Sequence, residues 1–465
     1  MAAHDRTDTY CVIGAGAAGI TAAKNLLQLG IAVEVIERED EVGGNWCFGK
    51  ANSSIYSSVH LISSKPFTQY TDFPIPDHYP TYLNHRQALE YLRTYARAFR
   101  VYDRIEFGRS VERVEPIDEG RAWQVTLDRG EVRAYRGVIV CNGHLWKPKV
   151  PEYPGTFNGV SVHSARYKTP DLLRGKRVLV VGAGNSGCDI AVESCHHAAR
   201  TFHSTRRGYY FYPKYMFGLP ADVLYEFTLK CRLPLAVRRL FGHLILRLNN
   251  AGTPESYGLP KPDHKLFEEH ILINSTLLYH LGHGDITPKP EIRELCGDRV
   301  RFSDGTEEQI DVIVYATGFH LTEFPFLDRA YFNWDQDRPG LYLNVFHPNY
   351  DNLFVVGLFQ TNTGNWPLMD YQSQLVGRFI AAQTESPRRA EAFRALKAGR
   401  RPNLTRGIRF RPSPKFAIEV EHYSYRARLK KLIAMMDVGP RTRRQAAPAR
   451  SSMSGAQPSC SSPAA

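Results

Sequence analysis

The stretch Gly14-Ala15-Gly16-Ala17-Ala18-Gly19 decides the fold of this 465-residue chain. It follows the apolar run Tyr10–Ile13, and a second such stretch, Gly182-Ala183-Gly184-Asn185-Ser186-Gly187, follows the apolar run Val178–Val181. In each stretch the first glycine permits a tight strand-to-helix turn, the second lets a pyrophosphate approach the backbone, and the third packs helix on strand. The phosphates then meet the positive end of the helix dipole. Two such units predict two dinucleotides in one protein, and hence electron transfer between them.

Composition limits the class of protein. With 43% apolar and 12% aromatic residues, the chain suits two or three domains with a substantial core. No stretch approaches the roughly 18 uncharged apolar residues of a membrane helix. The first expected strand begins by Tyr10, so we expect no cleaved signal peptide either. The eight cysteines form no CxxC pair, which predicts free thiols and a cytoplasmic location.

The positive charge is concentrated at the carboxyl end. Residues 381–465 carry 18 Lys and Arg against 5 Asp and Glu, whereas the first 380 residues carry 41 against 42. A nucleic-acid partner would need a basic stripe interleaved with aromatic residues or a recognised module, and the sequence has neither. We therefore expect a solvated basic tail and no nucleic-acid partner.

The order of the expected elements predicts an α/β fold with two Rossmann-like domains, one inserted into the other. Residues 8–38 and 176–204 each have the strand–helix–strand pattern, residues 87–99 have helical spacing, and residues 111–140 alternate like an antiparallel meander. We assign residues 1–170 and 311–438 to the first domain, 171–310 to the inserted domain with a helical insertion at about 210–270, and 439–465 to a disordered basic tail.

The stretch Leu235–Leu248 has the pattern of a basic amphipathic helix. A role at a membrane surface would place its apolar face in lipid. A helix of the inserted domain would instead pack its leucine face inward, and this is the arrangement we expect.

The residues after the second strand of each unit distinguish the two nucleotides. Glu37 lies where an acid accepts hydrogen bonds from a ribose and repels a 2′-phosphate, so the first site suits FAD or NAD. The equivalent segment of the second unit is Ser204-Thr205-Arg206-Arg207, without an acid. Because guanidinium groups pair well with a phosphate dianion, the second site suits NADPH through Arg206, with Arg207 or Ser204 assisting.

A fingerprint segment lies directly before the second glycine stretch. Residues 157–168 fit the pattern FxGxxxHxxxYK at every fixed position, through Phe157, Gly159, His163, Tyr167 and Lys168. With Asp311–Phe319 and Asn142-Gly143-His144, this segment makes the chain resemble the flavin-containing monooxygenases, a class B flavoprotein family, over residues 8 to about 385. The resemblance implies FAD and NADPH as cofactors, and O₂ and a small organic molecule as substrates. It also implies a C(4a)-hydroperoxyflavin that oxygenates a nucleophilic nitrogen or sulfur, so that no side-chain nucleophile is required.

The motifs and the resemblance together give the candidate binding residues. For FAD these are Gly14, Gly16, Ala17, Ala18, Gly19, Glu37, Arg38, Gly44, Asn45, Trp46 and Gln360. For NADP they are Gly182, Gly184, Asn185, Ser186, Gly187, Ser204, Arg206, Arg207, Thr317 and Gly318.

One position departs from the family pattern. The family usually carries an asparagine near the flavin, three residues before the lysine of a Ser-Lys motif, and here Ile62 stands there, before Ser64-Lys65. Isoleucine donates no hydrogen bond, so Ser63, Ser64 or bound NADP would have to support the oxygenated flavin. We take Ile62, Ser63 and Ser64 as flavin-site candidates, and the substrate class stays open.

Other classes of protein also carry two such glycine stretches. A disulfide reductase would need CxxxxC, but the residue five after Cys47 is Asn52. A Baeyer–Villiger or 2-oxo acid decarboxylating monooxygenase is an alternative, although the Baeyer–Villiger fingerprint ends in Trp rather than Tyr167-Lys168. A non-catalytic FAD/NADP redox sensor is a second alternative, and a homodimer stays open. We expect no metal site, because His196-His197 and His280/His283 lack Cys or carboxylate partners at ligand spacing.

Overall fold

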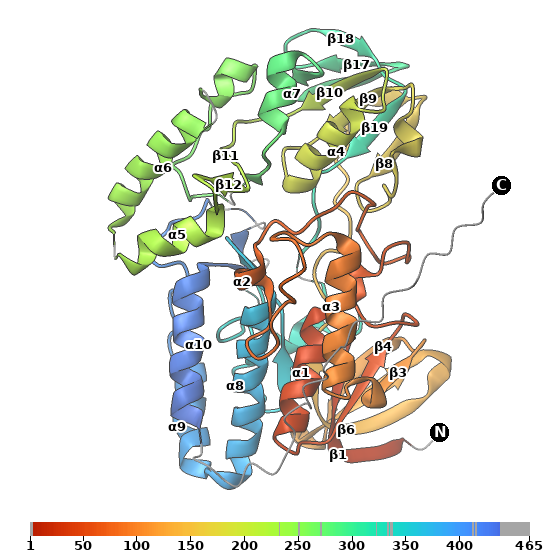
Figure 1. The fold of residues 1–465 in the computed structure, drawn as a ribbon. Helices are drawn as coiled ribbons and strands as arrows, with labels where there is room; N and C mark the ends of the chain where they lie inside the picture. The colour runs from red at the N-terminus through yellow and green to blue at the C-terminus, as the bar shows by residue number, and fades with distance from the viewer. Residues whose placement is uncertain are drawn as a thin grey trace, which may run out of the picture.

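The chain forms two units, one built on a mixed sheet and the other on a parallel sheet, which lie one above the other with a helical arm beside them (Figure 1). The computed structural model describes residues 3–437 except 232, 250–251, 270–271, 322, 333, 335–337, 412 and 414–415. The tail predicted to be disordered, residues 439–465, lies outside the described residues.

The lower unit in Figure 1 holds the first glycine stretch. Its sheet has the strand order β3-β2-β1-β6-β5-β4, with β20 paired to β6. The strands are β1 (His4–Ile13), β2 (Val33–Glu37), β3 (Ile105–Phe107), β4 (Val111–Ile117), β5 (Ala122–Leu127), β6 (Val132–Val140) and β20 (Leu353–Val355). β1, β2, β3, β6 and β20 run parallel, and β4–β6 form the antiparallel meander that the alternation predicts.

Helices from both ends of the chain cover this sheet. They are α1 (Ala17–Gln28), α2 (Lys65–Thr68), α3 (His85–Ala98), α8 (Trp366–Glu385), α9 (Pro387–Ala398) and α10 (His422–Met436), with the short parallel pair β21 (Gln360–Thr361) and β22 (Glu419–Val420). α3 begins at a capping box in which Asn84 accepts from the backbone of Gln87, whose side chain accepts from Asn84 in return. α1 and α8 pack side by side, so the amino-terminal and carboxyl-terminal parts of the chain share one core.

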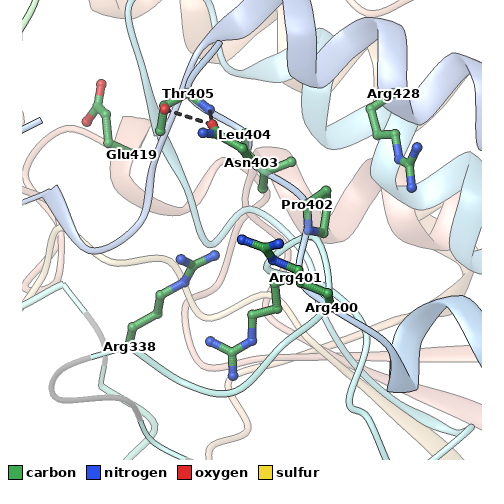
Figure 2. A pocket seen from close by; sticks show the side chains of 9 residues that line it. All are labelled: Arg338, Arg400, Arg401, Pro402, Asn403, Leu404, Thr405, Glu419 and Arg428. Atoms are coloured by element: carbon green, nitrogen blue, oxygen red, sulfur yellow. Dashed lines mark hydrogen bonds between the residues drawn. The ribbon is translucent and has the colours of Figure 1, made fainter. Parts of the chain in front are cut away.

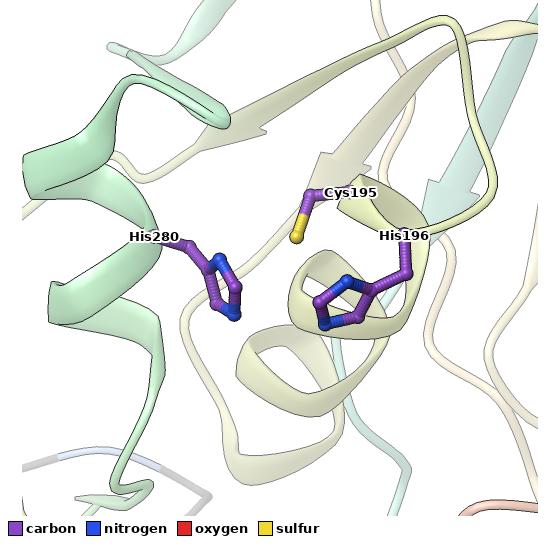
Figure 3. Close-up of side chains that lie close together, drawn as sticks. All are labelled: Cys195, His196 and His280. Carbon is purple, nitrogen blue, oxygen red and sulfur yellow. The ribbon is translucent and has the colours of Figure 1, made fainter.

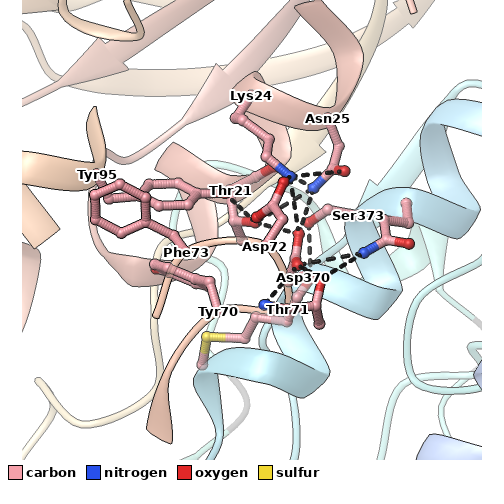
Figure 4. Close-up of polar contacts among 12 residues, drawn as sticks. Thr21, Lys24, Asn25, Tyr70, Thr71, Asp72, Phe73, Tyr95, Asp370 and Ser373 are labelled. Carbon is pink, nitrogen blue, oxygen red and sulfur yellow. Dashed lines mark hydrogen bonds and ion pairs between the residues drawn. The ribbon is translucent and has the colours of Figure 1, made fainter. Parts of the chain in front are cut away.

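A buried ionic network joins α1 to α8 (Figure 4). Lys24 of α1 is only 2% exposed and lies 2.6 Å from Asp72 and 3.5 Å from Asp370 of α8. Thr21 and Asn25 of α1 donate to Asp370 over 2.9 and 2.7 Å. Every charge in this network therefore has an opposite partner or a hydrogen bond, as burial requires.

The upper unit holds the second glycine stretch. Its sheet is parallel throughout in the order β15-β10-β9-β19-β8. These strands are β8 (Val160–His163), β9 (Arg177–Val181), β10 (Arg200–Ser204), β15 (Ile286–Lys289) and β19 (Val312–Tyr315), with α4 (Asn185–Cys195) and α7 (Leu277–His283) beside them. A second sheet adjoins it, made of β7 (Gly155–Phe157), β16 (Ile292–Gly297), β17 (Arg299–Phe302) and β18 (Glu307–Gln309).

The domain boundaries expected at 170/171 and 310/311 need correction. The expected boundaries place β8 and β19 in the first domain. Both strands instead pair within the parallel sheet of the upper unit, where β19 lies between β8 and β9. Buried parallel strands of either sheet have the same short apolar pattern. Long-range pairing decides which sheet such a strand joins. The local sequence therefore could not assign these two strands to a sheet.

The helical insertion forms the arm beside the upper unit. It contains β11 (Phe211–Tyr212), β12 (Tyr215–Met216), β13 (Leu219–Pro220), α5 (Ala221–Lys230), α6 (Leu235–Asn249) and β14 (Leu272–Ile273). Short 3₁₀ helices occur elsewhere at Gly44–Trp46, Tyr102–Arg104, Asp118–Gly120, Asp128–Gly130, Pro170–Leu173, Pro254–Tyr257 and Arg329–Tyr331.

The inward leucine face expected for α6 is wrong. Leu240 and Leu248 are 70% and 68% exposed, and Phe241 and Leu244 are exposed as well. The helix packs through a different face, on which a Cβ at Gly242 would lie 2.5 Å from the side chain of Leu266. Among the described residues no helix is long and apolar enough to cross a membrane.

Candidate functional site

The first glycine stretch forms a tight turn between β1 and α1, which we call the first cradle (Gly14–Gly19 with Gly44). Gly14 has φ +102°, and a Cβ there would lie 2.8 Å from the carbonyl oxygen of Cys141 at the end of β6. A Cβ at Gly19 would lie 1.8 Å from the oxygen of Gly14. These two positions therefore require glycine for the packing of the protein itself.

The middle glycine serves a different purpose. A Cβ at Gly16 would meet only the backbone of Gly44, at 3.6 Å or more, which is an ordinary contact. Gly16 caps α1 without a side-chain hydrogen bond, so the first N–H groups of the helix, including those of Ala17 and Ala18, remain for an anion. The backbone of the cradle thus fits a pyrophosphate.

Glu37 lies at the end of β2 beside this cradle and is buried. Its carboxylate accepts from the backbone N–H of Ala15 over 2.6 Å and from that of Glu39 over 2.9 Å. Burial raises the pKa of Glu37, and the two N–H donors oppose that shift. The neighbouring Arg38 is exposed. An acid fixed at this place is suited to the hydroxyls of a ribose.

The residues after Gly44 hold the loop that follows the cradle. The Asn45 side chain accepts from the backbone and the hydroxyl of Ser54, over 2.7 and 2.8 Å. Trp46 packs edge-to-face on Trp366, the first residue of α8, with ring centroids 5.9 Å apart. Gln360 lies on β21 and pairs through its backbone with Glu419 of β22.

The second glycine stretch repeats this geometry between β9 and α4, and we call it the second cradle (Gly182–Gly187). Gly182 has φ +111°, and its Cβ would lie 2.5 Å from the oxygen of Ala316, while a Cβ at Gly187 would lie 2.0 Å from the oxygen of Gly182. A Cβ at Gly184 would meet no atom within 4 Å. This open space above an uncapped helix start is what an approaching pyrophosphate needs.

The remaining candidates for NADP surround the second cradle. Asn185 accepts from the backbone N–H of Ile273 over 2.8 Å, and Ser186 follows it in the first turn of α4. Thr317 directly follows Ala316, whose carbonyl oxygen lies against Gly182, and its hydroxyl donates to the oxygen of Lys149 over 2.5 Å. Gly318 has φ +83°.

The three residues expected to bind a 2′-phosphate differ in availability. Ser204 is buried in β10 and donates to the oxygen of Pro290 over 2.7 Å. Arg207 forms an ion pair with the buried Glu269. Arg206 is exposed, and among the residues that the structure describes it has no ion-pair partner. Ser204 and Arg207 thus already have partners within the protein, and Arg206 is the one of the three without an ion-pair partner in the described part of the chain.

The fingerprint segment includes β8, the edge strand of the parallel sheet in the upper unit. At Gly159 a Cβ would lie 2.5 Å from the oxygen of Asp311, next to the ring of Phe157. His163 contacts the oxygen of Gly318 through Nε2 over 3.1 Å, and its Nδ1 accepts from the N–H of Ala165.

The end of the fingerprint joins the two units. Tyr167 donates to Glu193 of α4 over 2.5 Å. Lys168 donates to the carbonyl oxygens of Ser53 and Ile55, over 2.5 and 3.2 Å, in the loop that Asn45 holds. Burial lowers the pKa of Lys168. This lysine therefore connects the second unit to the loop beside the first cradle.

The flavin-site candidates lie on the segment before α2. Ile62 is half-buried, whereas Ser63 and Ser64 are buried. The Ser63 hydroxyl pairs with that of Thr68 over 2.8 Å. Thr68 also contacts the backbone oxygens of Ser63 and Ser64, which accept its proton, so the Ser63 hydroxyl donates to Thr68.

Asp222 is a residue of this region that the sequence did not reveal. It lies on α5 of the insertion, and its two oxygens accept from the backbone and the hydroxyl of Ser64 over 2.7 and 2.8 Å. Burial raises the pKa of Asp222, against the hydrogen bonds from Ser64. No local motif marks this aspartate, because its partner lies 158 residues earlier in the chain.

Two cavities in the described part of the chain are lined by residues outside both cradles. The larger, about 620 Å³, is lined by Arg338, Arg400, Arg401, Pro402, Asn403, Leu404, Thr405, Glu419 and Arg428 (Figure 2). The other, about 470 Å³, includes Glu41, Cys47 and His85. The candidate site is therefore defined by the backbone geometry of the cradles and not by either of these cavities.

Comparisons with known proteins agree with this geometry. The family described as flavin-binding monooxygenase-like matches residues 8–429. Flavin-containing monooxygenase 5 of Rattus norvegicus is 34% identical over 413 residues, which cover 84% of this chain and 76% of that protein. The chain belongs to the flavin-containing monooxygenase family. It is an FAD-dependent monooxygenase that uses NADPH and O₂.

Another relative and two solved structures extend the comparison. The dimethylaniline monooxygenase (N-oxide-forming) 2 of Pan troglodytes is 33% identical over 396 residues, covering 81% of this chain and 74% of that protein. A cyclohexanone monooxygenase shares the fold with a TM-score of 0.69 at 21% identity, over 93% of this chain and 98% of that one. An S-allyl-L-cysteine S-oxygenase from Allium sativum gives a TM-score of 0.64 at 20% identity, over 93% and 90%.

Proposed function

We propose that this flavin-containing monooxygenase transfers one oxygen atom of O₂ to a nucleophilic sulfur or nitrogen of a small organic substrate. FAD binds in the first cradle and NADPH in the second. The observation that carries the cofactor assignment is the contrast between the two cradles. A buried acid, Glu37, follows the first, whereas Arg206, which is exposed and has no ion-pair partner among the described residues, follows the second. The relatives named for N-oxide formation and S-oxygenation support the choice of nitrogen and sulfur.

The cofactors supply the redox chemistry, because bound FAD that has been reduced by NADPH activates O₂. The side chains and backbone of the protein bind and orient the two cofactors. The N–H groups at the start of α1 and α4 hold the two pyrophosphates, Glu37 holds the ribose of FAD, and Arg206 holds the 2′-phosphate of NADPH. No side-chain nucleophile is needed in this scheme.

Lys168 and Asp222 act as positioning residues in this proposal. Lys168 fastens the NADPH-binding unit to the loop beside the FAD cradle. Asp222 fastens the insertion to the segment Ile62–Ser64. Both contacts bridge separate parts of the chain, so they set the distance between the two cofactors and help to exclude water from the space between them.

The test is to identify products from the purified enzyme with NADPH, O₂ and a panel of sulfides, amines, ketones and 2-oxo acids. The proposal predicts a mass gain of one oxygen atom on sulfides or amines. The same gain on a ketone, with NMR showing an ester, would contradict it in favour of Baeyer–Villiger chemistry, and loss of CO₂ from a 2-oxo acid would indicate the decarboxylating reaction. NADPH consumption that no panel compound raises would favour the redox sensor.

We also propose a reducing compartment for the protein, the cytoplasm. The support is that the seven described cysteines are all free. Sedimentation of the purified protein would decide whether it forms the homodimer that the sequence left open.

A further inference from the structure

A thiol and two imidazoles meet on the face of the NADPH-binding unit where α4 ends (Figure 3). Cys195 is the last residue of α4, His196 follows it, and His280 projects from α7. One ligand atom from each of the three lies within 4.8 Å of the others. Sulfur and imidazole nitrogen are the ligands that zinc prefers in proteins.

A carboxylate orients one of these imidazoles. Nδ1 of His280 contacts Asp285 over 2.9 Å. Asp285 follows the turn that ends α7, where Gly284 has φ +79° and the N–H of Asp285 donates to the oxygen of His280. With Nδ1 donating to this carboxylate, Nε2 keeps its lone pair for an ion. A carboxylate behind a histidine ligand is the usual supporting arrangement of protein zinc sites.

The other two ligands are accessible and movable. His196 is exposed, and within the described residues its ring makes no hydrogen bond. It meets the His280 ring edge-to-face, with centroids 4.9 Å apart. Cys195 is partly exposed, and its thiol donates weakly to the oxygen of Val192 over 3.1 Å. Binding of one ion would require these side chains to rotate so that the ligand atoms, which lie within 4.8 Å of one another, come closer together.

We propose, against the sequence-based expectation of no metal site, that Cys195, His196 and His280 form a zinc site that ties the end of α4 to α7, with water as the fourth ligand. Binding releases the thiol proton to solvent and forms one Zn–S and two Zn–N bonds, with no change of oxidation state. Because α4 begins at the second cradle, the ion would brace the helix that carries the NADPH pyrophosphate. This proposal is independent of the substrate that the enzyme oxygenates.

Co²⁺ is the spectroscopic probe for this site. The purified holoenzyme is treated with a chelator, titrated with Co²⁺, and followed by visible and near-ultraviolet difference spectra. We expect one equivalent to give the intense bands of tetrahedral cobalt and a thiolate-to-cobalt charge-transfer band, both abolished by added Zn²⁺. Zinc should also raise the thermal midpoint of unfolding, since an ion that binds only the folded state stabilises it.

Variants show whether these residues are the ligands. Cys195→Ser should abolish the charge-transfer band, and His196→Ala, at an exposed position, should remove the tetrahedral spectrum without loss of bound FAD. Asp285→Asn should weaken Co²⁺ binding about 10- to 100-fold. Cys231→Ser is the matched control because Cys231 is an exposed thiol outside the cluster, and it should bind as the unmutated enzyme does.

Three results would overturn the proposal. They are the absence of a tetrahedral spectrum at millimolar Co²⁺, an unchanged spectrum in FAD-containing His196→Ala, and loss of the charge-transfer band in Cys231→Ser instead of Cys195→Ser.

Discussion

At the scale of single residues, Arg206 is the cation that the structure leaves available for a 2′-phosphate. Arg207 is occupied by Glu269, and Ser204 by the oxygen of Pro290. Loss of a charge-assisted contact costs about 1.5–3 kcal/mol. Arg206→Ala should therefore raise the KM for NADPH about tenfold or more. NADH, which lacks the phosphate, is the internal control in the same steady-state assay, and an equal loss with both nucleotides would show that Arg206 has a structural role.

Ile62 is a second residue with a measurable consequence. The serines that were expected to compensate for the missing asparagine are both engaged: Ser63 donates to Thr68 and Ser64 to Asp222. We therefore expect the unmutated enzyme to release part of its NADPH electrons as hydrogen peroxide, and Ile62→Asn to lower that share. Peroxide formed per NADPH consumed is the measurement. If the unmutated enzyme formed no peroxide, bound NADP or a drier site would be what stabilises the oxygenated flavin.

At the scale of elements, the contact between α1 and α8 depends on Asp370. Burial alone would raise the pKa of Asp370, but Lys24 and hydrogen bonds from Thr71, Asn25 and Thr21 outweigh burial and hold it below its usual value. Because the pKa is lower in the folded state, the stabilisation is present above about pH 4. It is lost as the pH falls through the lower, folded-state pKa.

Asp370→Asn should accordingly lower the free energy of unfolding by about 3 kcal/mol at neutral pH, because a buried cation loses a charged partner. Denaturant titrations at several pH values are the measurement, and the difference from the unmutated protein should shrink below about pH 4. Glu385→Gln, at the exposed end of α8, is the matched control. A difference that stays constant with pH would contradict the role of the charge.

At the scale of the whole molecule, much of the fold was predictable because its signals are local. The two glycine stretches, the acid Glu37 and the alternation of residues 111–140 all describe structure within a few residues of themselves. Long-range features were not predictable in this way. Three features depend on segments that lie far apart in the chain. They are the sheet in which Val312–Tyr315 pairs, the hydrogen bonds that Asp222 accepts from Ser64, and the proximity of Cys195 to His280.

Stability toward acid is also a property of the whole fold. His347 is buried, and burial lowers its pKa to about 4. Between that value and about 6.5 the unfolded chain binds a proton that the folded protein does not, so stability falls as the pH drops through this window. At pH 5 the loss from this residue is on the order of 2 kcal/mol. Thermal midpoints at pH 7 and pH 5 should show a smaller drop in His347→Asn, and the exposed His78→Asn should leave the drop unchanged.

The central claim is that two separate cradles hold the two cofactors and that electrons pass between them. The most direct measurement is the anaerobic loss of visible flavin absorbance after NADPH is added, in the unmutated protein and in two glycine variants. The unmutated protein should be yellow and bleach; Gly16→Val should lack flavin. Gly184→Val, whose side chain has room in the protein itself, should remain yellow and bleach only at far higher NADPH. Flavin retained in Gly16→Val, or normal bleaching of Gly184→Val, would contradict the account.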